Sequence, residues 1–369
     1  MTEESIHQSK SRSRIDRLRL LLSKAGADSL LVFHLPNIQY LCGFSGSAGL
    51  LLVEPSRVTL FTDSRYTFQA IEEVADSGVK VNIAKGGLLK AAGQSLKKCR
   101  RRIRVAYAPP HVTVAQKRAL DAAAGGSVRW VDAPGLVERL RSIKDGSELA
   151  LMANAARLIS EVFHFVLPRI ALGITELSLA AEIEYAMKQR GASGPSFESI
   201  VASGPRSAWA HARPSSKAIG KNELVVLDQG AILHGYCSDM TRTVFVGRAP
   251  DKVRRMYGAV AEAQEAAKTA IRPGVSAAAI DRAARQVLKK HGLARFFTHS
   301  TGHGLGIEVH EVPRLGRDDR AVLEEGMVVT VEPGVYIEGV GGIRIEDEVV
   351  VTARGAVNLT KAAREFLEL

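Results

Sequence analysis

The hydrophobic positions in the first 130 residues follow two different periods. Ile15–Ala25 carries apolar side chains at helical spacing, and Gly26 ends that pattern. The glycine-rich stretch from Asn37 to Gly49 predicts a turn-rich connection. Short apolar runs typical of buried strands are found at Ser29–Phe33, Gly49–Val53 and Val58–Thr62. This alternation continues to about Val131 and predicts an α/β domain.

The alternation of helices and strands breaks at Asp132-Ala-Pro-Gly135. After a short helical stretch, Lys144-Asp-Gly146 predicts a turn, and Ser147 with Glu148 opens a long helix through Glu161. A chain of 369 residues is expected to form two domains. We place the boundary between residues 135 and 146, which gives an N-terminal domain at 1–140 and a second domain at 141–369.

The second domain contains an internal repeat. The segments from Gly173 to Gly191 and from Gly274 to Gly292 have the same length, and each places Thr or Ser before an amphipathic helix that ends at glycine. Further along each half, an apolar strand ends in an acid, in Val225-Val-Leu-Asp228 and in Val329-Thr-Val-Glu332. We infer two duplicated halves related by a pseudo-twofold axis.

This repeat predicts a cluster of carboxylates. The pseudo-twofold axis brings Asp228 and Glu332 toward one another, and each half adds a second acid in a β-branched context, Asp239 and Glu346. Four facing carboxylates repel one another, so an apolar interior holds them only with compensating positive charge. Divalent cations supply that charge, and with one imidazole such a site suits Mn, Co, Zn or Fe.

A histidine-rich segment, from His299 to His310, offers the imidazole. The glycines on both sides of His303 allow close backbone approach to a metal, which favours this residue as the ligand. A dinucleotide-binding loop is excluded because Ile307 stands where its third glycine is required. Most other histidines lack such neighbours and are predicted to be surface or packing residues, including His7, His34, His164 and His291.

Composition and charge limit the classes of molecule that the chain is expected to bind. The chain has 50 Lys and Arg residues against 39 Asp and Glu residues, which gives a net charge of +11. Such a charge could favour binding of nucleic acid, an anionic membrane or acidic substrates. Much of it lies in two runs, Lys10, Arg12, Arg14, Arg17 and Arg19, and Lys97, Lys98, Arg100, Arg101, Arg102 and Arg104. Neither run has the interleaved aromatics of a single-strand binding surface. We therefore expect a solvated basic surface and no nucleic-acid partner.

The cysteines and the N-terminus point to the cytoplasm. Cys42, Cys99 and Cys237 are widely spaced and odd in number, which predicts neither a disulfide framework nor a structural zinc site. The acidic N-terminal segment lacks the apolar region of a signal peptide, and no apolar run is long enough to span a bilayer. We expect a cytoplasmic protein without a membrane partner.

Five residues together carry a family resemblance. Asp228, Asp239, His303, Glu332 and Glu346, in the contexts DQGA, SDMTRT, STGHGLGIEVHE, TVEPG and GIRIEDE, resemble the ligands of the pita-bread metallopeptidases. This resemblance covers nearly the whole chain. It implies an α+β protein, in which a smaller α/β domain of the creatinase N-terminal type precedes a pita-bread (creatinase/aminopeptidase) domain with the internal pseudo-twofold repeat.

The N-terminal domain narrows the branch of the family. The segments Asn37–Ser47 and Thr62–Tyr66 resemble the smaller domain of aminopeptidase P, prolidase and creatinase, and the intact ligand set excludes creatinase, which lacks the metals. The resemblance implies cleavage of Xaa-Pro bonds. The loop motifs favour aminopeptidase P, which acts on longer peptides, over prolidase, which acts on dipeptides. An inactive pita-bread binding module is the remaining alternative, and loss of a ligand would be its mark.

The resemblance also implies residue roles. Asp228 would bind one metal ion, His303 and Glu332 the other, and Asp239 and Glu346 would bridge the two. The two metals are expected to be Mn, with Co or Zn as alternatives, and to activate water for attack on the carbonyl before proline. Glu332 doubles as a candidate proton shuttle. A homodimer is expected by resemblance alone.

Further positions match the substrate cleft of the family. His211 and His310 line the cleft, with His310 the better candidate to bind the scissile carbonyl. His299, Tyr336 and Arg344 match positions around the substrate, and Arg344 has an equal alternative as an ion pair that orders Glu346. Family members often carry Asn and Pro where this chain has Arg206–His211, so Arg206 and Trp209 are expected to alter the pocket for the first residue.

Overall fold

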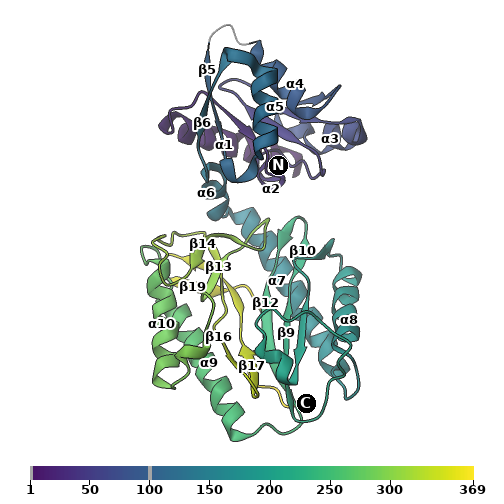
Figure 1. Cartoon of the computed structure of the whole chain (residues 1–369), viewed down its shortest axis with the longest axis vertical. Coiled ribbons are helices and arrows are strands. Elements are labelled where there is room, and N and C mark those ends of the chain that lie inside the picture. Colours follow the sequence, from purple (N-terminus) through teal and green to yellow (C-terminus); the bar gives the residue numbers. More distant parts are fainter. Residues whose placement is uncertain (1–2, 99–101) are drawn as a thin grey trace. The chain divides into compact units, whose positions relative to one another are not determined.

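The chain divides into two compact units, residues 1–141 and 142–369 (Figure 1). A computed structural model describes the backbone of residues 3–98 and 102–369, and side chains in those ranges from residue 11 onward. Cys99, Arg100 and Arg101, which are named in the sequence analysis, lie outside the described residues, as do the side chains of His7 and Lys10.

The first unit is built on a six-stranded sheet in the order β4-β3-β2-β1-β5-β6. β1 runs parallel to β5 and β5 parallel to β6, so the carboxyl ends of these three strands lie at one edge of the sheet. The strands are β1 (Ser29–Val32), β2 (Leu50–Val53), β3 (Val58–Thr62), β4 (Lys80–Ile83), β5 (Ile103–Tyr107) and β6 (Val128–Asp132). The first three confirm the predicted strands to within one residue at each end.

Six α-helices accompany this sheet: α1 (Glu3–Lys24), α2 (Leu35–Cys42), α3 (Thr67–Glu73), α4 (Leu88–Lys97), α5 (Val114–Ala124) and α6 (Leu136–Ser142). Side chains of α4 and α5, including Leu96 and Leu120, pack against the strands in one core. The prediction of a turn-rich connection after Asn37 was wrong in part, because α2 occupies its beginning. Pro36 lies in the first turn of α2, and Gly43 ends the helix with a φ of 85°.

Several residues of the basic runs make structural contacts. The Arg14 guanidinium lies 4.2 Å from the Tyr40 ring centroid and donates a hydrogen bond to the Tyr40 carbonyl. Arg19 donates to the Glu54 carbonyl, and Arg104 pairs with Asp28 at 3.2 Å. These arginines hold parts of the first unit together, a role that the expectation of a solvated basic surface did not include.

The second unit has two helical layers around its sheets (Figure 1). Helices α7 (Gly146–Val166) and α8 (Glu176–Gln189) pack on a sheet in the order β12-β9-β8, and α9 (Asp251–Ala270) and α10 (Ala277–Lys290) pack on a sheet in the order β14-β13-β15-β18-β19. The strands are β7 (Gly194–Pro195), β8 (Ile200–Ser203), β9 (Glu223–Gln229), β10 (Ala231–Leu233), β11 (Tyr236–Cys237), β12 (Met240–Val246), β13 (Gly302–Gly304), β14 (Glu311–Leu315), β15 (Val328–Val331), β16 (Gly334–Ile337), β17 (Gly341–Arg344), β18 (Asp347–Thr352) and β19 (Gly355–Asn358).

The internal repeat is confirmed by matching backbone contacts. α8 and α10 have 14 residues each, and the amides of Gly173 and Gly274 donate to the carbonyls of Ile219 and Leu323. The residues before the two helices form isolated bridges, Thr175 with Ala218 and Ser276 with Val322. One detail differs: the Thr175 side chain caps its helix, whereas the Ser276 side chain makes no such hydrogen bond.

Helix α7 begins earlier and ends later than the sequence indicates. Asp145, rather than Ser147, caps it, and the Glu148 side chain returns a hydrogen bond to the Asp145 amide in a capping box. By length and apolar character the segment Gly146–Arg169 could cross a membrane. Half of its most apolar window is buried inside this unit, with Ile159 and Val162 in the core. The apolar face of α7 is thus accounted for by packing.

Candidate metal centre

Strand ends position the five candidate ligands in the second unit. Asp228 lies in β9, Asp239 immediately precedes β12, and His303 lies in β13. Glu332 directly follows β15, and Glu346 stands between β17 and β18. The two halves meet where the Glu346 amide donates to the Thr241 carbonyl at 3.1 Å, opposite Asp228 in the register of β9 and β12. The acids of the two halves are therefore brought together.

The ligand atoms of this cluster lie close to one another. One ligand atom each from Asp239, His303 and Glu346 all lie within 4.8 Å of one another. His303 Nε2 lies 3.5 Å from Asp239 Oδ2 and 3.5 Å from Glu332 Oε1. His303 Nδ1 is 3.0 Å from the Gly304 carbonyl, to which it donates, so Nε2 carries the lone pair and faces the carboxylates.

The pKa values of the acids show how unfavourable their crowding is. Burial raises the pKa of Asp239 and of Glu346 well above the ordinary range, and neighbouring carboxylates raise both further. Burial also raises the pKa of Glu332 to about 7, which Arg344 opposes and Asp228 reinforces. Burial lowers the pKa of His303, so the imidazole is neutral and available as a ligand. Bound cations would stabilise the ionised carboxylates and so lower the pKa values of these acids again.

A buried carboxylate oxygen without a hydrogen-bond partner also indicates a cation site. Among the described residues, Asp228 Oδ1 is buried and has no hydrogen-bond partner. A buried carboxylate oxygen without a donor is costly, and a cation satisfies it where no donor reaches. Oxygen ligands with one neutral imidazole are a donor set that divalent metal ions accept. The residues at this centre therefore fit divalent cations.

Glu348 is a member of the centre that the sequence analysis missed. Its Oε1 accepts the Asp239 amide at 2.8 Å, its Oε2 is buried without a hydrogen-bond partner, and burial raises its pKa to about 8. It holds the backbone of a candidate ligand in place. The available signal was the spacing of Glu346 and Glu348 two residues apart, which places both side chains on one side of a strand.

Thr241 joins two charged groups of the centre. Its hydroxyl donates to Glu346 Oε2 at 2.7 Å and accepts from Arg344 Nε at 3.0 Å. We expect Thr241→Val to weaken binding of Mn²⁺ by roughly 10- to 100-fold, as loss of an outer hydrogen-bond partner does in other metal sites. Isothermal titration would measure the change. Thr243→Val, which removes the bonds of a buried hydroxyl on the same strand to the Arg344 backbone, is the matched control; equal weakening by both would contradict the specific role.

Arg344, Tyr336 and His299 form one hydrogen-bonded chain. Arg344 Nη2 donates to Asp228 Oδ2 at 2.6 Å, and Nη1 donates to the Tyr336 hydroxyl at 2.5 Å. That hydroxyl lies 3.0 Å from His299 Nε2, and His299 Nδ1 lies 2.8 Å from the Ser300 carbonyl. Burial, reinforced by Arg344, lowers the pKa of His299 to about 3, so its ring is neutral. Arg344 pairs with Asp228 rather than with Glu346, the partner suggested by the sequence.

The two predicted cleft histidines lie beside this centre. The rings of His303 and His310 pack edge to face with centroids 4.4 Å apart, and burial lowers the pKa of His310. His211 is exposed and follows Ala210, whose carbonyl accepts Arg344 Nη1 at 3.1 Å. His211 also helps to lower the pKa of His310 and His299. Both histidines therefore face the same region as the ligand cluster.

Arg206 has a structural partner that the sequence did not indicate. Its Nε donates to Glu176 Oε2 at 2.9 Å, and its guanidinium lies 4.8 Å from the centroid of the Trp209 ring. Trp209 itself is 59% exposed. Burial raises the pKa of Glu176, but the hydrogen bonds from Ser215, Ser203 and Arg206 outweigh it and the pKa lies below the ordinary value. Arg206 thus neutralises a buried carboxylate.

We expect Arg206→Gln to reduce the free energy of unfolding by about 1–3 kcal/mol, because Glu176 loses its charged donor while the serine donors remain. Urea unfolding at neutral pH would measure this loss. Arg213→Gln, which removes a guanidinium paired with Glu198 on the exposed surface, serves as the control and should have almost no effect. Equal stability of both variants would show that the Arg206 pair contributes nothing.

Comparisons with known proteins agree on both units. Residues 150–353 match the family model described as metallopeptidase family M24, and residues 14–143 match the Creatinase/Prolidase N-terminal domain. The chain is 34% identical to an Xaa-Pro dipeptidase of Pyrococcus horikoshii, over 96% of this chain and 98% of that protein. The structure of an Xaa-Pro dipeptidase from Bacillus anthracis is similar with a TM-score of 0.93 and 36% identity, covering 97% of this chain and all of the other. An X-Pro aminopeptidase from Thermotoga maritima is similar with a TM-score of 0.87 and 34% identity, covering 96% of this chain and all of the other.

Proposed function

The chain belongs to metallopeptidase family M24, and from that membership we propose that it hydrolyses the peptide bond before proline in Xaa-Pro dipeptides. The family resemblance and the α+β fold predicted from the sequence are both confirmed. The observation that carries the proposed chemistry is the convergence of Asp239, His303 and Glu346 within 4.8 Å, beside Asp228 and Glu332.

The family uses divalent metal ions, and the residues present fit them. We propose that Asp228, Asp239, His303, Glu332 and Glu346 hold two cations, with Mn²⁺ the preferred ion and Co²⁺ or Zn²⁺ as substitutes. When bound, the cations would activate water and polarise the carbonyl before proline. By the family resemblance, Asp239 and Glu346 would be the ligands shared by the two cations.

The protein's own side chains supply proton transfer and orientation. Glu332, whose Oε1 lies 3.5 Å from His303 Nε2, is proposed to take a proton from water and return it to the proline nitrogen. His310, partly buried beside His303, is proposed to donate a hydrogen bond to the scissile carbonyl, and His211 to line the cleft. Arg344 is proposed to act chiefly through Asp228 and Tyr336, because its donors are already occupied by protein groups.

The preference for dipeptides departs from the sequence-based expectation. The loop motifs of the first unit favoured aminopeptidase P, but the similar proteins named as dipeptidases support prolidase better. The structure adds a feature that favours the same choice, a hollow of about 600 Å³ beside His299. Its charged lining residues are Arg285, Arg295, Arg314 and Arg317 together with Asp318 and Asp319, which leaves an excess of positive charge. Positive charge near the substrate cleft suits the free carboxylate that directly follows proline in a dipeptide.

Hydrolysis of Ala-Pro and Ala-Pro-Ala by metal-stripped protein, with and without added Mn²⁺, tests the proposal. We expect manganese-dependent release of alanine chiefly from Ala-Pro. Faster cleavage of Ala-Pro-Ala would restore aminopeptidase P as the activity. Cleavage of neither substrate with Mn²⁺, Co²⁺ or Zn²⁺ would favour the inactive binding module. Ala-Ala serves as the control for a requirement for proline.

The assembly and location are separate proposals. We propose a cytoplasmic homodimer. The described cysteines, Cys42 and Cys237, are free thiols, as suits a reducing compartment. Phe68 and Ile71 on α3 are 86% and 56% exposed, and their contact with a second copy would remove apolar surface from water. Sedimentation equilibrium would show a single species of one chain mass if the dimer proposal is wrong.

A further inference from the structure

Three potential metal ligands meet in the first unit, away in sequence from the five ligands of the metal centre. His34 lies two residues beyond β1 and directly precedes α2, His111 ends the 3₁₀ turn η3 (Pro109–His111) after β5, and Glu138 lies in the first turn of α6 after β6. Because β1, β5 and β6 are parallel neighbours, their carboxyl ends deliver all three residues to one edge of the sheet. Ligands of α/β sheets commonly bind at this edge.

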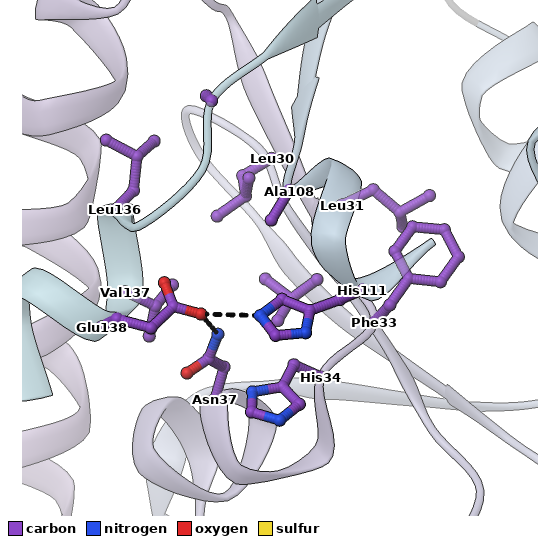
Figure 2. A pocket seen from close by; sticks show the side chains of 12 residues that line it. Leu30, Leu31, Phe33, His34, Asn37, Ala108, His111, Leu136, Val137 and Glu138 are labelled. Atoms are coloured by element: carbon purple, nitrogen blue, oxygen red, sulfur yellow. Dashed lines mark hydrogen bonds and ion pairs between the residues drawn. The ribbon is translucent and has the colours of Figure 1, made fainter. Parts of the chain in front are cut away.

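The three side chains are close neighbours (Figure 2). One ligand atom from each of His34, His111 and Glu138 lies within 4.8 Å of the others. His111 Nε2 is 3.0 Å from Glu138 Oε1, and the rings of His34 and His111 stack with centroids 4.0 Å apart and planes 6° apart. Each of the three is partly exposed, so ions from solvent can reach them.

A small cavity lies among these residues. Its volume is about 20 Å³, which exceeds the roughly 10–15 Å³ that one water-sized particle needs. Apolar side chains such as Leu30, Val32 and Val137 line the rest of it (Figure 2 shows Leu30 and Val137). A cavity of this size holds a single ion or water and is too small for an organic cofactor, and its apolar walls would strengthen electrostatic attraction to a cation.

A second layer of hydrogen bonds orients the carboxylate. Asn37 Nδ2 donates to Glu138 Oε1 at 2.7 Å, and Arg141 Nη1 donates to Asn37 Oδ1 at 2.8 Å. Burial raises the pKa of Glu138, but the hydrogen bonds from Asn37 and His111 outweigh it, so the group is ionised at neutral pH. Ligands of metal sites are commonly held by such outer partners.

From this geometry we propose that His34, His111 and Glu138 bind one zinc ion, with the remaining position open to water. Two imidazoles and one carboxylate are a ligand set that zinc accepts with three protein ligands and one water. Around zinc, ligand atoms are about 3.3 Å apart, given bonds of about 2.0 Å in a tetrahedron. The His111 and Glu138 atoms, 3.0 Å apart, are close to this spacing. On zinc binding, His111 would give up its hydrogen bond to Glu138, and His34 would leave the ring stack so that its in-plane lone pair faces the ion. The sequence analysis had placed His34 among the surface or packing residues.

The His291–Glu262 pair in the second unit is a matched comparison. His291 Nε2 lies 2.8 Å from Glu262 Oε2 on the exposed surface, so it reproduces the histidine–carboxylate pair. No third ligand group joins it among the described residues. A zinc site at His111 and Glu138 should therefore depend on His34, whereas His291 should contribute no tight site.

Zinc content of the full chain tests the proposal without reference to activity. The wild type and the variants His34→Ala, His111→Ala, Glu138→Gln and His291→Ala would be loaded with ZnCl₂, passed through a desalting column and measured by plasma mass spectrometry. Far-UV circular dichroism would establish that each variant is folded. We expect the first three variants to lose one zinc per chain relative to wild type and His291→Ala to lose none.

An anomalous difference map at the zinc edge supplies a second, independent readout, with a peak expected between His34, His111 and Glu138. Unchanged zinc content in all three variants, or equal loss in His291→Ala, would overturn the proposal. If a variant fails to fold, the map of the wild-type crystal decides, and absence of a peak at these residues would equally overturn it. Because metal content is read directly, this result is independent of whether Ala-Pro is hydrolysed.

Discussion

Replacement of Glu332 by glutamine is expected to lower kcat for Ala-Pro by roughly a thousandfold, within the range that loss of a general acid–base residue causes. The substitution removes the proposed proton-transfer group, whose Oε1 lies 3.5 Å from His303 Nε2. It keeps the size of the side chain, so the fold should remain. Steady-state kinetics at saturating Mn²⁺ would measure the effect.

Glu338→Gln is the control for this substitution, because Glu338 is exposed and lies six residues further on, beyond the end of β16. Its kcat should equal that of the wild type. His303→Ala tests the same centre from the other side: it should abolish turnover and reduce the amount of bound metal while circular dichroism stays unchanged. Full activity of either Glu332→Gln or His303→Ala would refute the assignment of the centre.

The metal-free protein is expected to become less stable as pH rises from about 6.5 to about 9. Burial raises the pKa of Glu332 from 4.5 to about 7 and that of Glu348 from 4.5 to about 8. For these two acids the folded state binds more protons than the unfolded state between these values, so the stability they contribute is fully present below pH 4.5 and is lost as pH passes through 7 and 8. The buried His299, with its pKa lowered to about 3, has the opposite effect below pH 6.5. The raised pKa of Glu332 alone corresponds to a loss of unfolding free energy on the order of 3 kcal/mol.

Urea unfolding at pH 6 and pH 9 in the presence of a chelator would measure this slope. Added Mn²⁺ should remove or reverse it, because the cation favours the ionised carboxylates and competes with protons for them. Glu332→Gln should make the metal-free slope shallower, whereas Glu338→Gln should not. Higher stability of the metal-free protein at pH 9 than at pH 6 would contradict the crowding of carboxylates in the centre.

The sequence predicted the repeat and its acids because both are encoded locally. Helix caps, terminating glycines and strands that end in an acid recur at fixed spacing, and each depends on the backbone preferences of a few neighbouring residues. The same reasoning failed at α2, where a glycine-rich stretch was interpreted as a turn. The helix forms there because its buried face, including Ile38 and Leu41, packs into the unit, which local preference does not reveal.

Which residues contact one another within the two sites became visible only in the folded structure. Glu348 supports Asp239 from 109 residues away, and Arg344 pairs with Asp228 across 116 residues. His111 and Glu138 are 27 residues apart and meet through the order of two parallel strands. A local pattern indicates which face of an element is buried, but it does not state which two buried faces meet.

The sequence by itself predicted two domains, the duplicated halves and the five candidate ligands. Chain length, recurring caps and strand-terminal acids, and the motifs around each ligand are all visible without knowledge of which elements pack together. Only the tertiary structure showed that Arg344 pairs with Asp228, that Glu348 accepts a hydrogen bond from the Asp239 amide, and that His34 lies beside His111 and Glu138. Those contacts arise from the packing of strands distant in the chain. The physical reason is that packing, which buries the most apolar surface and satisfies the most hydrogen bonds at once, is a property of the whole chain.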